Sequence, residues 1–119
     1  MACGSELTMH CDGNTLPVFK AGDTFSHAAA VALPEGVWVA TCRLRTRYMG
    51  DFVGNVVVHL GALVDMYTPL VLEALPAETR GWRDGVHLLD VRFEDTTGAV
   101  LHTVTYQLPV ETAITHPAP

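Results

Sequence analysis

Two apolar-rich runs near the C-terminus alternate hydrophobic and polar positions with the period of two that is typical of β-strands. The first run covers residues 86–93 and the second covers residues 100–110, and Gly98 lies in the turn signal of residues 94–98 between them. The positions that share one parity are His87, Leu89, Val91 and Phe93 in the first run, and Val100, Val104, Tyr106, Leu108 and Val110 in the second. This pattern predicts a long antiparallel hairpin with one packed face, in which His87 pairs near Tyr106 and His102 near Arg92.

Earlier segments of strand length are separated by turn-forming residues. Residues 37–48 alternate clearly, and residues 52–60 and 68–73 also have strand patterns. Residues 25–33 are rich in alanine and lack a clear alternation, and we assign them to a strand because eight or nine residues are few for a helix that must pack on a sheet. Residues 75–82 are expected to form a short turn of helix.

About seven short strands, with a turn signal about every 8 to 12 residues, are the pattern of an antiparallel β-sandwich. We therefore expect an all-β, immunoglobulin-like sandwich with at most one short helical turn, formed as a single domain by residues 1–119. Residues 1–5 and 112–119 are expected to be extended tails. The paired cysteines of antibody domains are missing, so apolar packing must hold the sandwich together. The expected core residues are Trp38, Leu44, Val91, Phe93 and Tyr106.

Composition restricts the possible partners. Charged residues make up 17% of the chain, against about 25% in an average protein, and the formal net charge is −6. Nucleic-acid binding depends on clustered Lys and Arg, so the charge argues against a nucleic-acid partner. No run of about 18 apolar residues and no signal-peptide pattern is found, so no membrane partner is expected and the chain is expected in the cytoplasm. A chain with so little surface charge fits a subunit of an assembly.

Candidate catalytic and metal-binding groups have simpler structural interpretations. The six histidines show no HxH, HxxxH or HExxH spacing, and the three cysteines show no CxxC spacing, so we expect no metal and no cofactor. No GxSxG motif or glycine-rich phosphate loop is present. Cys42 has the parity of a buried residue in its strand, where a thiol is inert. We therefore expect a protein that is not an enzyme.

The basic residues show one pattern of interest. Arg43, Arg45 and Arg47 recur at period two, so all three are expected on one face of one strand. Carboxylates of neighbouring strands could simply neutralise them. Alternatively, the row is a candidate subunit interface in which the guanidinium groups bind carboxylates of a neighbouring molecule.

Five segments in a fixed order resemble small immunoglobulin-like structural proteins of tailed bacteriophages and prophages, a group similar to the N-terminal domain of phage baseplate upper proteins. The segments are residues 21–25 (AGDTF), 75–82 (LPAETRGW), 85–93 (GVHLLDVRF), 95–98 (DTTG) and 110–115 (VETAIT). The resemblance implies a virion structural protein that is assembled in the host bacterial cytoplasm, with other virion proteins and copies of itself as partners. Its place in the tail, baseplate, neck or capsid decoration stays open.

Two other functions are possible. A carbohydrate- or receptor-binding sandwich would present exposed aromatic side chains, for which Trp82, Tyr67 and Tyr48 are the candidates. A small enzyme would need a concave pocket in which titratable groups converge.

Overall fold

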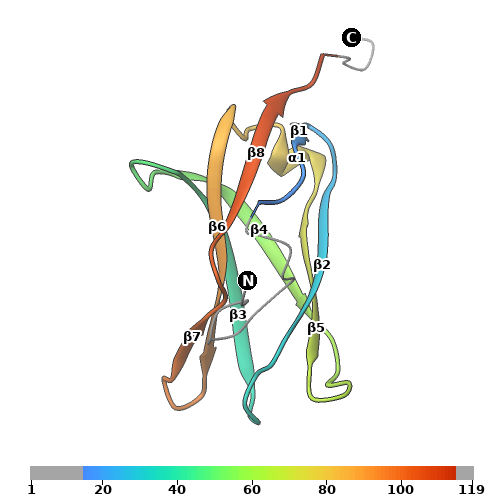
Figure 1. Cartoon of the computed structure of the whole chain (residues 1–119), viewed down its shortest axis with the longest axis vertical. Helices are drawn as coiled ribbons and strands as arrows, with labels where there is room; N and C mark the ends of the chain where they lie inside the picture. Colours follow the sequence, from blue (N-terminus) through green and yellow to red (C-terminus); the bar gives the residue numbers. More distant parts are fainter. Residues whose placement is uncertain (1–14, 115–119) are drawn as a thin grey trace.

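The computed structural model describes residues 15–114, which form eight strands and one short helix (Figure 1). The elements are β1 (Phe19–Ala21), β2 (Phe25–Val31), β3 (Trp38–Thr46), β4 (Phe52–Leu60), β5 (Thr68–Ala74), α1 (Pro76–Thr79), β6 (Gly85–Asp95), β7 (Val100–His102) and β8 (Tyr106–Thr112). The all-β class and the short helical turn are confirmed. In the described part of the chain, no helix is long and apolar enough to span a membrane.

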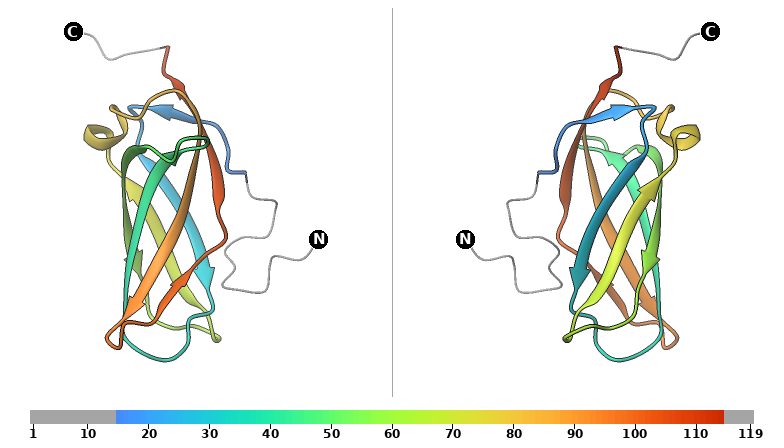
Figure 2. Two further views of the ribbon diagram at one scale, coloured as in Figure 1. Left: turned by 90° about the vertical axis from the view of Figure 1, so that its left-hand side faces the viewer. Right: turned by 90° about the vertical axis from the view of Figure 1, so that its right-hand side faces the viewer.

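The strands hydrogen-bond in the order β1-β8-β6-β3-β4-β5-β2, and β7 pairs with β6 beside β8. Strand β4 bonds to β3 through its first half and to β5 through its second half, so the sheet turns from one layer to the other within this strand. The sheet wraps into a nearly closed barrel, which the side views in Figure 2 show. It is also mixed, because β1 runs parallel to β8. The expected sheet was purely antiparallel, with about seven strands.

Strand β1 was missed by the sequence pattern because three residues are too few to show an alternation. It pairs with Val110, Glu111 and Thr112 at the end of β8. Thr112, which was expected to begin a C-terminal tail, is therefore the last residue of a strand, and its hydroxyl donates a hydrogen bond to the Asp84 carboxylate at 2.6 Å. The expected tail at residues 1–5, and residues 115–119 of the tail expected at 112–119, lie outside the described residues.

The C-terminal hairpin has one more residue in its second arm than a regular ladder allows. Arg92 lies opposite His102 as predicted, but Leu89 lies opposite Tyr106, so three steps along β6 match four steps along the partner strand. His87 consequently faces Leu108 instead of Tyr106. The irregularity is at Thr103, whose buried hydroxyl accepts a hydrogen bond from the Val91 amide and donates one to the Val104 carbonyl.

Four of the five expected core residues, Leu44, Val91, Phe93 and Tyr106, are fully buried. Trp38 was also expected in the core, but it is half-buried at the margin of the core. The reason is that Trp38 is the first residue of β3 and lies at the end of the sheet. The buried tryptophan is Trp82, which retains 3% exposure and follows α1.

Candidate subunit interface

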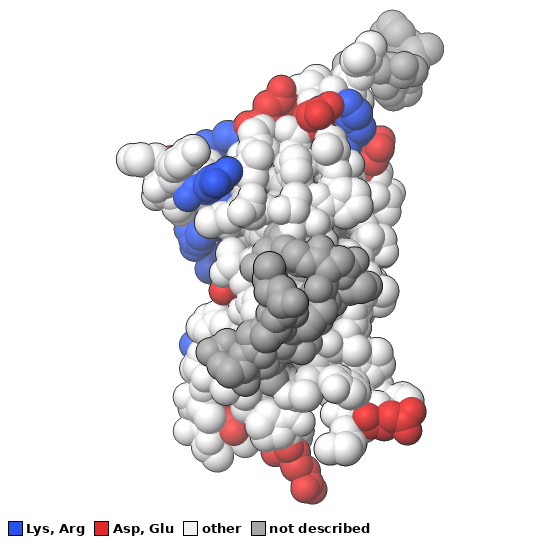
Figure 3. Space-filling model, in the orientation of Figure 1, with Lys and Arg blue, Asp and Glu red and all other residues white. Residues whose placement is uncertain are grey.

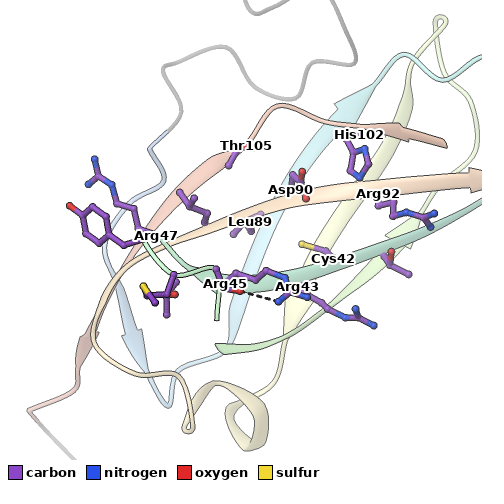
Figure 4. A pocket seen from close by; sticks show the side chains of 15 residues that line it. Cys42, Arg43, Arg45, Arg47, Leu89, Asp90, Arg92, His102 and Thr105 are labelled. Atoms are coloured by element: carbon purple, nitrogen blue, oxygen red, sulfur yellow. Dashed lines mark hydrogen bonds between the residues drawn. The ribbon is translucent and has the colours of Figure 1, made fainter. Parts of the chain in front are cut away.

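Alternation along β3 positions the arginine row. Cys42 and Leu44 point into the core, whereas Arg43 and Arg45 are exposed on the outer face of the sheet. The sequence pattern had placed Arg47 on the same strand as Arg43 and Arg45. In the structure Arg47 follows the last residue of β3 and belongs to the β3–β4 turn. All three arginines are among the residues that line one groove (Figure 4).

A β-bulge lies where the hairpin leaves the body of the protein. Leu44 pairs with Gly54 but Arg45 pairs with Phe52, so Val53 is an extra residue in β4. Bulges bend the strand and increase its twist, and the hairpin tip here projects sideways from the barrel (Figure 1). We call residues 45–52 the arginine arm.

Local hydrogen bonds hold the tip of the arm. The Thr46 amide donates to the Asp51 carbonyl at 2.8 Å, and the Asp51 amide donates to the Thr46 hydroxyl at 2.9 Å. The Arg45 guanidinium donates to the carbonyl of Gly50, which adopts the positive φ of 68° that the turn requires. Arg47 lies over the ring of Tyr48, 5.5 Å from its centroid. The arm is thus an ordered element although Tyr48 is 87% exposed.

The groove is open and has a volume of about 580 Å³. Arg92 and His102 lie at its far end, on β6 and β7. Four of the seven basic residues of the sequence therefore line it, and within the described residues Asp90 is its only carboxylate. Sequence analysis did not include Arg92 and His102 in the site, although the predicted pairing of these two residues across the hairpin contained the signal.

No ion pair joins an arginine of the row to a carboxylate among the described residues. The ion pairs between them join Lys20 to Glu111, His59 to Glu73 and Arg92 to Glu94. Asp90 is the register partner of Arg43, but no ion pair joins the two side chains within the described structure. Among the described residues, the guanidinium groups of the row therefore have no carboxylate partner in an ion pair.

Cys42 lies in the wall of the groove but is buried. Burial, together with the negative charge of Asp90, raises the pKa of its thiol to about 12. The reactive form of cysteine is the thiolate, so Cys42 is a poor nucleophile at neutral pH. Cys3 and Cys11 lie outside the described residues.

The three candidate aromatic residues do not form a common surface. Trp82 is buried, and Tyr48 and Tyr67 lie in the turns before and after β4, at opposite ends of that strand. Among the described residues, no three His, Cys, Asp or Glu side chains gather in a metal-binding arrangement.

A scan against models of known protein families found no match, and a search of curated proteins found no similar sequence.

Proposed function

We propose that this protein is a structural subunit of a bacteriophage or prophage particle and that it acts through contacts with other subunits. The observation that carries the proposal is the arginine row. Three guanidinium groups with no carboxylate partner among the described residues lie on the outer face of β3 and on a projecting arm. A protein of net charge −6 has carboxylates in excess to bind such a surface, either in its own copies or in similarly acidic neighbours.

The fold is consistent with an immunoglobulin-like sandwich whose two layers are joined through β4. One layer would contain β3, β6 and β8, and the other β5 and β2. The aromatic rings of His27 on β2 and Tyr106 on β8 lie 6.1 Å apart, as expected for residues that meet between two facing layers. This interpretation agrees with the resemblance of five sequence segments to small immunoglobulin-like virion proteins.

A carbohydrate-binding module is the second candidate, and it has less support. Sugar recognition by stacking uses aromatic rings that share a surface. The burial of Trp82 removes the largest ring, and the remaining candidates, Tyr48 and Tyr67, lie at opposite ends of β4. An enzyme has less support still, because the one cysteine in the groove has a raised thiol pKa.

The proposal is tested by looking for the chain in particles. Phage particles from the host that carries the gene are purified on a density gradient and analysed by quantitative mass spectrometry. We expect the chain to co-migrate with major virion proteins in a fixed ratio. Abundance in the lysate together with absence from the particles would contradict the proposed function.

The role of the row is tested by the triple change of Arg43, Arg45 and Arg47 to serine. We expect incorporation into particles to fall at least tenfold, because the contacts with carboxylates are lost. Arg80→Ser, which removes an exposed positive charge outside the groove, is the matched control. Normal incorporation of the folded triple variant would show that the row is an ordinary solvated surface.

A further inference from the structure

We infer that the arginine arm docks on the opposite end of a second copy of this chain. This inference rests on the proposed function and names the partner of the arginine row. The receiving surface is formed by three connections, residues 32–37, 61–67 and 95–99, which we call the loop end. These connections lie together at the lower end of the barrel in Figure 1.

Strand register brings the three connections together. Val31 pairs with Thr68, so the connection that follows β2 begins beside the one that precedes β5. Trp38 pairs with Asp95, so the same connection ends beside the β6–β7 turn. The loop end is thus one continuous surface built on paired strand ends.

The charge of the loop end is opposite to that of the arm. Its connections contain Glu35, Asp65 and Asp95 and no Lys, Arg or His. The arm carries Arg45 and Arg47 against Asp51. In Figure 3, acidic side chains dominate the lower end of the visible face, and basic side chains gather on the upper left, where the arm projects.

Both surfaces also expose apolar side chains. On the arm, Tyr48, Met49 and Phe52 are exposed. The exposed apolar residues of the loop end are Val37, Leu63, Val64, Met66 and Tyr67. An apolar centre with a polar, charged rim is the usual composition of a protein–protein interface, whereas an acidic polymer is bound mainly by clustered bases.

The backbone of the loop end presents Met66 to solvent. Val64 and Tyr67 exchange two backbone hydrogen bonds, and the two residues between them, Asp65 and Met66, both have positive φ, at 49° and 71°. Methionine seldom adopts this conformation, and its side chain at the tip of the turn is 81% exposed. Backbone strain that exposes an apolar side chain is expected where that side chain makes a contact with another molecule.

The two surfaces lie at opposite ends of the barrel, so the contact is heterologous and can be repeated from copy to copy. Such contacts generate closed rings or open filaments. Rings and filaments are the arrangements in which a small subunit can build a particle component.

Two variants of the full chain separate the two surfaces. Arg47→Ser with Tyr48→Ser removes the arm contact, and Glu35→Gln with Asp65→Asn removes the charges of the loop end. Asparagine at position 65 tolerates the left-handed backbone there. Arg80→Ser and Asp23→Asn, two exposed residues outside both surfaces, are the matched controls. Circular dichroism establishes that each variant is folded.

Analytical ultracentrifugation then measures assembly. We expect the original chain and both controls to form concentration-dependent oligomers, and each interface variant to have a dissociation constant raised at least tenfold. An equimolar mixture of the two variants retains one intact arm and one intact loop end, so we expect it to form heterodimers that stop at two copies. A rise to about 0.5 M salt should weaken both the oligomers of the original chain and the heterodimers of the mixture, because the charges lie at an exposed rim.

Two results would overturn the inference. Assembly that depends on Arg47 but not on Glu35 and Asp65, with no heterodimer in the mixture, would mean that the arm binds another surface, and it would leave the proposed subunit role intact. An original chain that stays monomeric at all concentrations would exclude self-docking, and a monomer that binds dextran sulfate through Arg47 would assign the groove to an acidic polymer. Absence from particles, in contrast, would contradict the proposed function itself.

Discussion

The two ends of the barrel each contain one tryptophan, and the two side chains differ in how deeply they are buried. At the end that carries α1, Trp82 is buried against Phe19 and Phe25, with ring centroids 5.4 and 5.7 Å away. At the loop end, Trp38 lies half-buried, and its indole N–H donates to the Pro34 carbonyl of the adjacent connection at 2.9 Å. At the α1 end the tryptophan therefore closes the core, whereas at the loop end it stays partly in contact with solvent.

This difference indicates which residues stabilise the fold and which are exposed for contacts with other molecules. The α1 end is held by buried aromatic residues and by hydrogen bonds that join α1 to the strands, such as the one from the Asn55 amide on β4 to the Glu78 carboxylate at 3.0 Å. The loop end lacks a comparable aromatic cluster among the described residues and exposes Met66 and Val37. Stability should therefore be more sensitive to changes in the buried aromatic cluster beside α1 than to changes at the loop end. Assembly should be sensitive to changes in the exposed residues of the arginine arm and of the loop end.

The largest expected effect separates the two tryptophans. Trp82→Ala should lower the free energy of unfolding by about 3 to 5 kcal/mol, because it leaves a large cavity. Trp38→Ala should lower it by only about 1 kcal/mol, since much of the indole is already in contact with water. Urea titration followed by circular dichroism measures both values. Equal losses would remove the distinction between the two ends.

The second prediction concerns the space beside Trp82. A Cβ atom at Gly54 would lie 2.1 Å from the Nε1 atom of Trp82, so the indole would have to move. Gly54→Ala should destabilise the protein by about 2 kcal/mol through overpacking. Gly81→Ala, where the nearest atom is 3.7 Å away, is the matched control and should have a much smaller effect. A tolerated alanine at position 54 would mean that the α1 end is loosely packed.

Thr79 gives a third, smaller effect at the same end. Its buried hydroxyl donates to the Asp23 carbonyl at 2.6 Å and accepts from the Gly22 amide at 3.1 Å, which joins α1 to the β1–β2 turn. Thr79→Val keeps the shape but removes both bonds, and we expect a loss of about 1 to 2 kcal/mol. Thermal denaturation measures this loss. An unchanged melting temperature would show that these bonds do not stabilise the turn.

The smallest effect belongs to the loop end. The pKa of Asp95 is lowered, foremost by the hydrogen bond from the Thr97 hydroxyl and also by backbone amides of the same turn, including Ala99. A carboxylate with a lowered folded-state pKa contributes stability that is fully present above its unfolded pKa of about 3.9 and is lost as the pH falls through the folded value.

Asp95→Asn should therefore lower the melting temperature slightly at pH 7, and the difference should shrink as the pH is lowered from 7 to below about 4. Melting curves of both proteins across this range measure the effect. A difference that is independent of pH would mean that the ionised carboxylate does not stabilise the turn.

Strand patterns were predictable from the sequence because alternation is a local property. Residues 52–60 were predicted as a strand and correspond to β4 (Phe52–Leu60), and the outward orientation of Arg43 and Arg45 followed from parity alone. Parity gives the face on which a residue lies but not its distance from the centre of the core. For that reason Trp38 was assigned to the core although it lies at the end of the sheet.

The remaining features depend on partners that are distant in sequence. The burial of Trp82, which follows α1, requires the missing side chain at Gly54 on β4, and a glycine within a strand pattern was the available signal. The bulge at Val53, which marks the base of the arginine arm, appears only when β3 and β4 are paired. The lack of carboxylate partners for the arginine row likewise depends on side-chain positions that no pattern specifies.

The parallel pairing of β1 with β8 has a mechanical consequence. The Leu16 amide donates to the Gln107 carbonyl at 2.8 Å, and Phe19, Lys20 and Ala21 continue the ladder as far as Thr112. A pull that separates the two ends of the described chain acts along both strands in opposite directions, so it loads these hydrogen bonds together in shear instead of opening them one after another. A subunit connected to its neighbours through both termini would resist extension at this pair of strands first.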